Sequence, residues 1–156
     1  MAGPQLTGFT PIQTGTAVVN VQSSMRFVGG ATFKFIYDLP RFEIGVLWNT
    51  RGWVNTSDTL HSLAMPVLAK LPWEIDKDLD IEFGVGWEAD HPVFGAEPYN
   101  QFMFGLLGSI GISADFEDWL FEFDVRYLVG FDNVSDQFNG ARPRDFQALA
   151  GVKWRF

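Results

Sequence analysis

The sequence predicts an all-β fold, an eight-stranded antiparallel up-and-down transmembrane β-barrel, from three observations. Large apolar residues alternate with polar or small ones in several segments, aromatic residues make up 16% of the chain, and tight linkers alternate with long ones. Successive side chains of a strand point to opposite faces. In a small membrane barrel the apolar face meets lipid and the polar face fills the interior. No apolar run approaches the ~20 residues that a membrane-spanning helix needs.

The strands differ in how clearly they alternate. The clearest is "WLFEFDVRYLVGF", in which Phe121 and Phe123 share one face while Glu122 and Asp124 share the other. "RFEIGVLWN", "LDIEFGVGWE" and "DFQALAGVKWRF" repeat this pattern, whereas "QFMFGLLGSIGIS", the segments around Lys34 and Lys70, and above all the N-terminal strand show it more weakly. We expect the eight strands at roughly 15–23, 28–37, 41–53, 61–72, 79–89, 101–114, 119–131 and 145–156.

The ends of the strands define the topology. "DLP", "PWEIDKD" and "DFED" are tight linkers, while "GWVNTSDTL", "ADHPVFGAEPYN" and "DNVSDQFNGARPR" are longer. After a short first connection near residues 23–27, this alternation indicates periplasmic turns and outer loops. We expect residues 1–14 to form an N-terminal periplasmic segment and residues 15–156 the barrel domain. The first residues lack the basic and apolar regions of a signal peptide, so either the signal was removed or the protein is not exported. For an outer-membrane barrel we expect the signal to have been removed.

The polar face carries charges of both signs next to glycines, which suits a narrow lumen filled by side chains. Unpaired charges in so narrow a space are costly. We therefore expect a lumenal network of ion pairs, and the alternative is a proton or ion relay through Glu122, Asp124 and Arg126. The expected network contains Lys34, Glu43, Lys70, Asp80, Glu82, Glu88, Glu122, Asp124, Arg126, Lys153 and Arg155.

Tryptophan and tyrosine supply a second indication of a membrane barrel, because they gather where strands meet the lipid headgroups. The topology predicts an aromatic girdle at each end. The periplasmic girdle contains Tyr37, Trp73, Trp119 and Trp154, and the outer girdle contains Trp53, Trp87 and Tyr99. The alternative is a water-soluble, lipocalin-like barrel or a sandwich, in which these aromatic residues form a buried core.

The composition excludes several classes of function. The formal net charge of -8 repels nucleic acid, so we expect no nucleic-acid partner. The absence of cysteine removes thiolate nucleophiles and cysteine metal sites. His61 and Ser62 contain the groups of a nucleophilic site, but neighbours on a strand point to opposite faces and cannot readily pair. We expect no catalytic residue, no cofactor and no enzymatic activity.

Two acidic segments contain oxygen or imidazole groups that bind metals in other proteins. His91 lies between Asp90 and Glu97 without a recognisable ligand spacing. The loop that contains Asp132, Asn133, Asp136 and Asn139 lacks the residue order of an EF-hand. We therefore expect solvated polar loops here and no metal site.

Three segments carry a family resemblance. "HSLAMPVLAKLPW" (61–73), "FEFDVRYLVGFDNV" (121–134) and "AGVKWRF" (150–156) resemble, in order and spacing, the outer-membrane β-barrel domain of Bacteroidota known as the PorT-like group, over about residues 29–156. The shared features are Met65-Pro66, an acidic-x-Arg-Tyr strand and a terminal aromatic-x-Phe. Pro66 would remove a hydrogen bond from the sheet, which strands tolerate at a bulge or rim.

The resemblance implies a barrel of the bacterial outer membrane without common catalytic residues. Trp154 and Phe156 resemble the signal that the barrel-assembly machinery recognises. We expect contacts with outer-membrane lipid and with this machinery, and a structural or interaction role, in which the barrel joins a protein partner in the envelope. The alternative function is a lipid-modifying enzyme of the lipid A deacylase or acyltransferase type.

Overall fold

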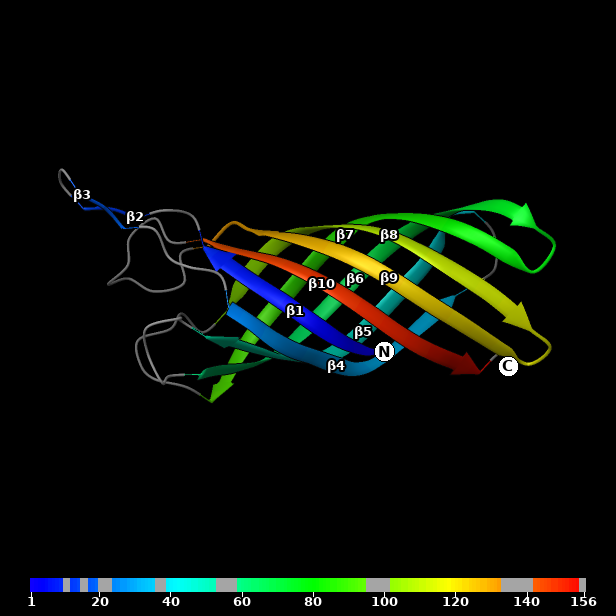
Figure 1. The fold of residues 1–156 in the computed structure, drawn as a ribbon, viewed down its shortest axis with the longest axis horizontal. Helices are drawn as coiled ribbons and strands as arrows, with labels where there is room; N and C mark the ends of the chain where they lie inside the picture. Colours follow the sequence, from blue (N-terminus) through cyan, green and yellow to red (C-terminus); the bar gives the residue numbers. More distant parts are fainter. Residues whose placement is uncertain are drawn as a thin grey trace.

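The chain folds as a closed barrel in which all neighbouring strands are antiparallel (Figure 1). The computed structural model describes all residues except 10–11, 15–16, 20–23, 36–38, 53–58, 95–101, 133–141 and 155–156. The barrel strands close in the order β1-β10-β9-β8-β7-β6-β5-β4, as the sequence predicts for eight strands. Their bounds are β1 Ala2–Phe9, β4 Ser24–Phe35, β5 Arg41–Gly52, β6 Thr59–Asp76, β7 Leu79–Phe94, β8 Met103–Phe116, β9 Trp119–Gly130 and β10 Pro143–Trp154. Among the described residues, no helix is long and apolar enough to cross a membrane.

The first strand differs from the prediction. β1 lies in the wall between β4 and β10, so residues 2–9 belong to the barrel and not to a periplasmic segment. The prediction of a barrel strand at 15–23 is wrong. Within this range the described part contains β3 (Ala17–Val19), which pairs with β2 (Ile12–Thr14) in a separate two-stranded sheet. The alternation of β1 is hard to see in the sequence, because Gly3 is small and Pro4 is atypical of a strand. Leu6 is its large apolar residue that faces outward.

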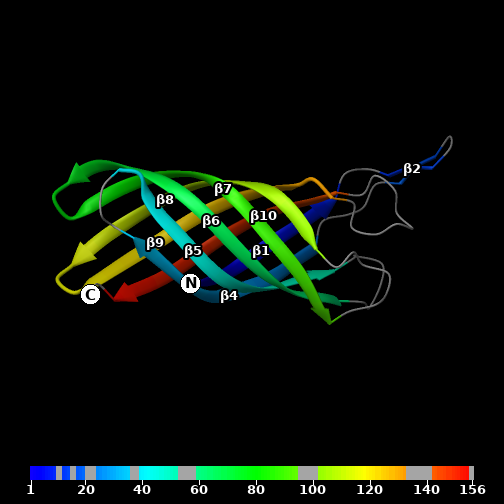
Figure 2. The same cartoon turned by 180° about the vertical axis from the view of Figure 1, so that it is seen from behind.

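Tight turns and long connections lie at opposite ends of the barrel. The β6–β7 turn (77–78) and the β8–β9 turn (117–118) lie at one end, where β10 also ends, whereas the N-terminus lies about midway along the wall (Figures 1 and 2). The β2–β3 sheet lies at the other end, so the first connection is long and not short as predicted. We call these ends the turn end and the loop end.

The wall separates an apolar outside from a polar inside. Along β8 and β9, exposed and buried residues alternate without a break over most of each strand. The outside carries Phe33, which is 62% exposed, and Trp73, which is 70% exposed. A soluble protein with these aromatic residues in its core is therefore the wrong alternative. The apolar outer belt is the surface that a membrane barrel presents to lipid.

The hairpin formed by β6 and β7 is longer than predicted. β6 has 18 residues and β7 has 16. Pairing of Ser62 with Pro92 carries β7 past Ala89, where the sequence predicts its end. Pro66 lies inside β6 and not at a rim, and the irregularities of this hairpin lie at His61/Ser62 and Glu74/Asp76. Pro66 pairs with Glu88, while the pairing of β6 with β5 is interrupted between Val67 and Ala64, as the missing N–H group of proline requires.

Candidate functional site

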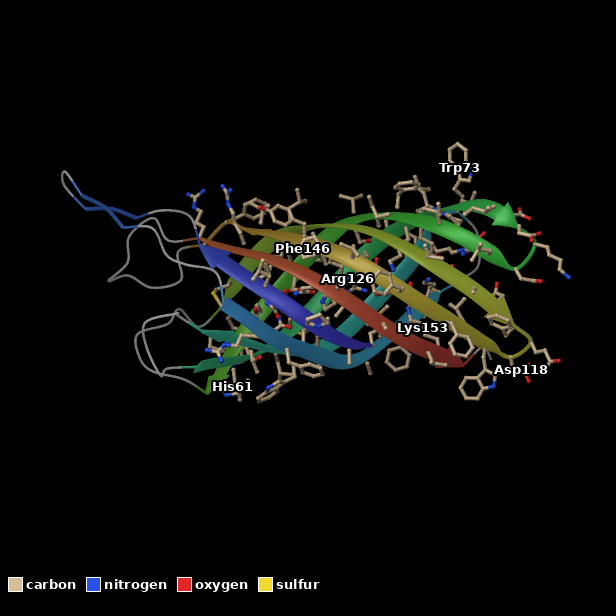
Figure 3. All side chains as sticks on the ribbon, viewed as in Figure 1. His61, Trp73, Asp118, Arg126, Phe146 and Lys153 are labelled. Atoms are coloured by element: carbon tan, nitrogen blue, oxygen red, sulfur yellow. The ribbon has the colours of Figure 1, made fainter. Side chains whose placement is uncertain are left out.

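Among the described residues, ten charged side chains meet inside the barrel towards its turn end. We call them the lumenal ion network: Lys34, Arg41, Glu43, Lys70, Asp80, Glu82, Glu122, Asp124, Arg126 and Lys153. They come from β4, β5, β6, β7, β9 and β10, where residues spaced by two point inward. Five are cations and five are carboxylates, so their formal charges cancel. Figure 3 shows Arg126 and Lys153 along the barrel.

Lys70 is the centre of the network. Its Nζ lies 2.8 Å from Glu122 Oε1 and 2.8 Å from Asp124 Oδ2, both on β9. It also lies 3.3 Å from Glu43 Oε2 and 3.6 Å from Glu82 Oε2. The side chain of Lys70 is 0% exposed, so these carboxylates replace its water. A single ammonium group thereby joins β5, β6, β7 and β9.

The remaining cations connect the same carboxylates to other strands. Lys153 Nζ lies 2.7 Å from Glu43 Oε2 and 2.5 Å from Glu122 Oε2. Lys34 Nζ lies 2.7 Å from Glu122 Oε1 and 2.6 Å from Glu82 Oε2. These contacts span the interior from β4 and β10. They make the network continuous across the lumen.

Two arginines complete the network. Arg126 Nη2 donates to Glu43 Oε1 at 2.5 Å, and its Nε donates to Asp124 Oδ2 at 2.9 Å. Arg41 donates to Asp80 Oδ2 at 2.7 Å and to Glu82 Oε1 at 2.9 Å. Arg126 is fully buried, whereas Arg41 and Asp80 are partly exposed at the turn end. The network thus passes from buried pairs to a solvated rim.

Glycines make room for these long side chains. A Cβ atom on Gly84 would lie 3.2 Å from Lys70 Cγ and 2.2 Å from Ser109 Oγ. A Cβ atom on Gly111 would lie 2.9 Å from Asp124 Oδ1. A larger residue at either position would displace a side chain of the lumen. The glycines of the inner face are therefore a packing requirement of the charged interior.

An apolar layer lies next to the ion network. Leu47 lies two inward positions after Glu43 on β5, with Gly45 between them, Leu68 precedes Lys70 on the inner face of β6, and Leu128 follows Arg126 on that of β9. These residues belong to two buried clusters, of which the first is also contacted by Met1. The clusters consist of Val28, Leu47, Ala64 and Leu149, and of Leu68, Leu107 and Leu128.

A polar layer lies beyond the apolar one, towards the loop end. Gln147 and Asn49 are fully buried there, two residues beyond Leu149 and Leu47 on the same strands. Asn49 Nδ2 donates to Glu88 Oε1 at 3.5 Å across the lumen from β5 to β7. Other buried members are Gln5, Ser62, Asp90 and Asp145. The lumen is thus divided into an ion network, an apolar layer and an outer polar layer.

Most of the predicted charged residues lie where the sequence places them, on the inner face. Nine of them belong to the ion network, and Glu88 lies in the outer polar layer. Arg155 lies outside the described residues. Sequence reasoning missed Arg41, although it precedes Glu43 by two positions and so shares its face. The polar layer was missed because amide and hydroxyl residues do not stand out as charges do.

The aromatic girdles are described in part. Trp73 and Trp119 face outward at the turn end, and Trp119 pairs with the backbone of Trp154. Trp87 also faces outward, but β7 continues to Phe94, so the prediction that Trp87 marks the outer end of its strand is wrong. Tyr37, Trp53 and Tyr99, the side chain of Trp154, and all of Phe156 lie outside the described part of the chain.

The catalytic candidates lie on opposite faces of the wall. Ser62 is buried in the lumen, whereas His61 lies on the outside, with its ring centroid 5.7 Å from that of Trp48 (Figure 3). The wall therefore separates the imidazole from the hydroxyl group. A serine nucleophile needs its base within hydrogen-bonding distance.

The metal candidates are also separated. The ring of His91 stacks on Phe102, with centroids 4.7 Å apart, while Asp90 is buried on the inner face. Asp132 Oδ2 accepts a hydrogen bond from the backbone N–H of Phe104 at 2.7 Å. Glu97, Asn133, Asp136 and Asn139 lie outside the described residues. In the part that is described, no three His, Asp or Glu side chains are grouped in a way that could hold a metal ion.

Comparisons with known proteins give a likeness of fold. No protein-family model matches the sequence, and no curated protein sequence matches it. The outer membrane protein OprG from Pseudomonas aeruginosa is similar in structure, with a TM-score of 0.61 and 14% identity over 99% of this chain and 93% of OprG. OmpT of Vibrio cholerae and its loop L8 deletion mutant give TM-scores of 0.33, and this chain spans about half of each. The fold of this chain is that of an eight-stranded outer-membrane β-barrel.

Proposed function

We propose that this chain is an integral protein of a bacterial outer membrane whose lumen is closed by side chains, and that it acts as a structural or interaction subunit of the envelope. The three-layered lumen carries this proposal. Buried ion pairs and an apolar layer occupy the interior. An eight-stranded barrel is just wide enough for such a filling.

The apolar outer belt favours the membrane location. Ile110 and Phe123 face outward in the middle of β8 and β9 and are 58% and 50% exposed. A continuous belt of this kind is unfavourable in water and favourable in lipid. Outer-membrane lipid is accordingly the first partner that we propose.

The PorT-like group is the family that we propose, on the basis of its three sequence segments. Its implied assembly signal, Trp154 and Phe156, makes the barrel-assembly machinery a second proposed partner. A further envelope protein is the third. The group has no common catalytic residues, which agrees with the separation of His61 from Ser62 by the wall.

Two measurements test this function. In planar bilayers, we expect no stable conductance of nanosiemens size, because the apolar layer and the ion network obstruct the lumen. In a chromatographic assay of lipid A and phospholipid incubated with the refolded protein, we expect no turnover. Stable large channels would contradict the closed lumen, and turnover that His61→Ala abolishes would establish the lipid-modifying alternative.

A further inference from the structure

A groove lies on the outside of the barrel near its turn end. It has a volume of about 700 Å³ and crosses β8, β9 and β10. Two small residues leave it open, because Ala114 lies opposite the large ring of Phe121 and Ala150 lies opposite that of Phe123. Its outward-facing lining is apolar and consists of Ile112, Ala114, Phe121, Phe123, Ala150 and Val152. We call it the outer groove.

The packing of the strands defines the outer groove. The ring of Phe116 packs edge-on against that of Phe121, with their centroids 5.5 Å apart. Phe121 therefore has an aromatic neighbour towards the turn end and a small neighbour, Ala114, beside it on β8. All the lining residues lie in strands that pair with one another. The groove is thus a feature of the paired wall and not of a loop.

The outer groove lies at the depth of lipid acyl chains. Phe121 follows Asp118 by three residues, which is about 10 Å along a strand. Half of the hydrocarbon core of a bilayer is about 15 Å thick. Trp119 faces outward between these residues, where tryptophan marks the boundary with the lipid headgroups. A phospholipid whose headgroup lies at the turn end therefore has its acyl chains beside the groove.

The turn end next to the outer groove is acidic. Glu117 and Asp118 form the exposed β8–β9 turn, and Figure 3 shows Asp118 at the tip of this hairpin. At the ends of the two hairpins, the described and exposed carboxylates are Glu74, Asp76, Asp78, Glu117 and Asp118, whereas the described and exposed cation is Lys77. A surface with this excess of negative charge repels anionic headgroups and attracts an ammonium group.

We propose that the outer groove and the β8–β9 turn together bind one phospholipid with an ammonium-bearing headgroup, of the phosphatidylethanolamine class. One acyl chain lies in the groove, and the carboxylates of Glu117 and Asp118 select the headgroup by its charge. A phosphatidylglycerol with the same acyl chains fits the groove equally well, but its anionic headgroup carries no cation to place beside these carboxylates. The inference rests on the lipid partner proposed above and adds the class of lipid and where it binds.

A second copy of this chain is a poorer occupant of the outer groove. A copy with the same orientation in the membrane places its own turn end at the same depth. Its carboxylates at Glu117 and Asp118 would then face an equally acidic turn end, and like charges repel. The ammonium group of a lipid headgroup meets no such repulsion.

Native mass spectrometry of the detergent-refolded protein tests the site, because it resolves single bound lipids. The two probes are dioleoyl phosphatidylethanolamine and dioleoyl phosphatidylglycerol, which have the same acyl chains and differ in their headgroups. We expect the apparent Kd of the first bound lipid to be about fivefold lower for phosphatidylethanolamine, as exposed charge pairs can supply. Equal values, or tighter binding of phosphatidylglycerol, would overturn the proposal.

A matched pair of variants tests the outer groove. Ala114→Phe places a ring in the groove and should raise the Kd of both lipids about fivefold, as the loss of apolar contact requires. Ala69→Phe is the control, because Ala69 faces outward on β6, where it pairs with Phe42 and Val85 away from the groove. It should leave both Kd values unchanged. Electrophoretic mobility of unheated samples shows whether each variant is folded. Unchanged binding to folded Ala114→Phe, or an equal loss in both variants, would overturn the proposal.

A second pair of variants tests the headgroup and does not alter the groove. Glu117→Gln/Asp118→Asn should abolish the preference for phosphatidylethanolamine. Glu74→Gln/Asp78→Asn removes the same number of carboxylates from the other hairpin and should retain the preference. A preference that survives the first double variant, or that both double variants lose equally, would overturn the proposal.

Two other outcomes identify a different explanation. Lipid-free dimers that Ala114→Phe abolishes would place a second copy in the outer groove and overturn the proposal. A chain that binds neither lipid and is monodisperse without detergent would overturn both this inference and the lipid partner on which it rests. Equal binding of the two lipids would overturn this inference alone, so the two failures are distinguishable.

Discussion

Lys70 of β6 and Glu122 of β9 form an ion pair of 2.8 Å across the lumen, although two other strands separate β6 from β9 in the wall. The pair joins opposite parts of the barrel through its interior. Both side chains are 0% exposed. Because neither side chain can be solvated by water, each charge is stabilised only by its ion-pair partners, and removal of either partner leaves an uncompensated buried charge.

Replacing Lys70 with Met should strongly destabilise the barrel. The change leaves four carboxylates without their shared cation, and removal of one partner of a buried ion pair costs about 3–5 kcal/mol. Urea unfolding in detergent would measure the loss. Lys77→Met is the control, because Lys77 is 84% exposed in the β6–β7 turn and should change the free energy of unfolding by less than about 0.5 kcal/mol. If Lys70→Met lowered the free energy of unfolding as little as the control, the lumenal ion network would not stabilise the barrel.

Charge balance should matter more than the number of charges. The double variant Lys70→Met/Glu122→Gln removes one cation and one carboxylate. We expect it to be less destabilised than Lys70→Met alone, because replacing both partners avoids an uncompensated buried charge. The same unfolding experiment compares the two variants. Additive losses would show that the two side chains act independently.

Two neighbouring glycines should respond differently to the same substitution. A Cβ atom on Gly86 would lie 1.9 Å from the carbonyl oxygen of Val67, whereas one on Gly108 has nothing within 4 Å. We therefore expect Gly86→Ala to disrupt β6–β7 pairing and lower the refolding yield. Gly108→Ala should refold normally. Electrophoretic mobility of unheated samples separates folded from unfolded barrels, and equal yields would contradict this packing.

A charge on the outer belt should be costly in proportion to its depth. Phe123 lies in the middle of β9, opposite Ile112 and Ala150, and Phe116 lies at the end of β8. In lipid vesicles, we expect Phe123→Lys to lower the free energy of unfolding by about 2–4 kcal/mol and Phe116→Lys by about 0–1 kcal/mol. Similar losses for both variants would argue against a membrane-embedded belt.

Phe156 should affect biogenesis more than stability. If Trp154 and Phe156 form an assembly signal, deletion of Phe156 lowers the outer-membrane level of an exported form in cells. Refolding of the purified chain in detergent should stay nearly unchanged. Immunoblotting of membrane fractions and refolding yields are the two readouts. An equal loss in both would indicate a folding defect, and unchanged levels in cells would remove the signal.

The alternation of side chains predicts most of the wall, because period two is visible wherever large apolar residues mark one face. It does not show β1, where Gly3, Pro4 and Gln5 leave a short and weak signal. The alternation also does not show that β7 continues through Pro92. Proline disfavours a strand locally, but pairing with Ser62 of β6 extends β7 past it.

The inward direction of the charges could be predicted, but their partners could not. Glu43 contacts Arg126 and Lys153, which lie 83 and 110 residues away along the chain. Which charges meet depends on the tilt and stagger of the strands, and alternation contains no information on either. Arg41 could have been found by extending the inner face of β5 by two positions from Glu43.

The distant pairing within the lumenal ion network constrains the order in which the barrel enters a membrane. Lys34 near the start of the chain and Lys153 near its end both contact Glu122. An open sheet would carry these charges into hydrocarbon without partners, which is costly. We therefore expect the sheet to curl and to enclose its charges with water before lipid fully surrounds its apolar face. Replacement of that water by ion pairs would then couple closure of the barrel to its insertion.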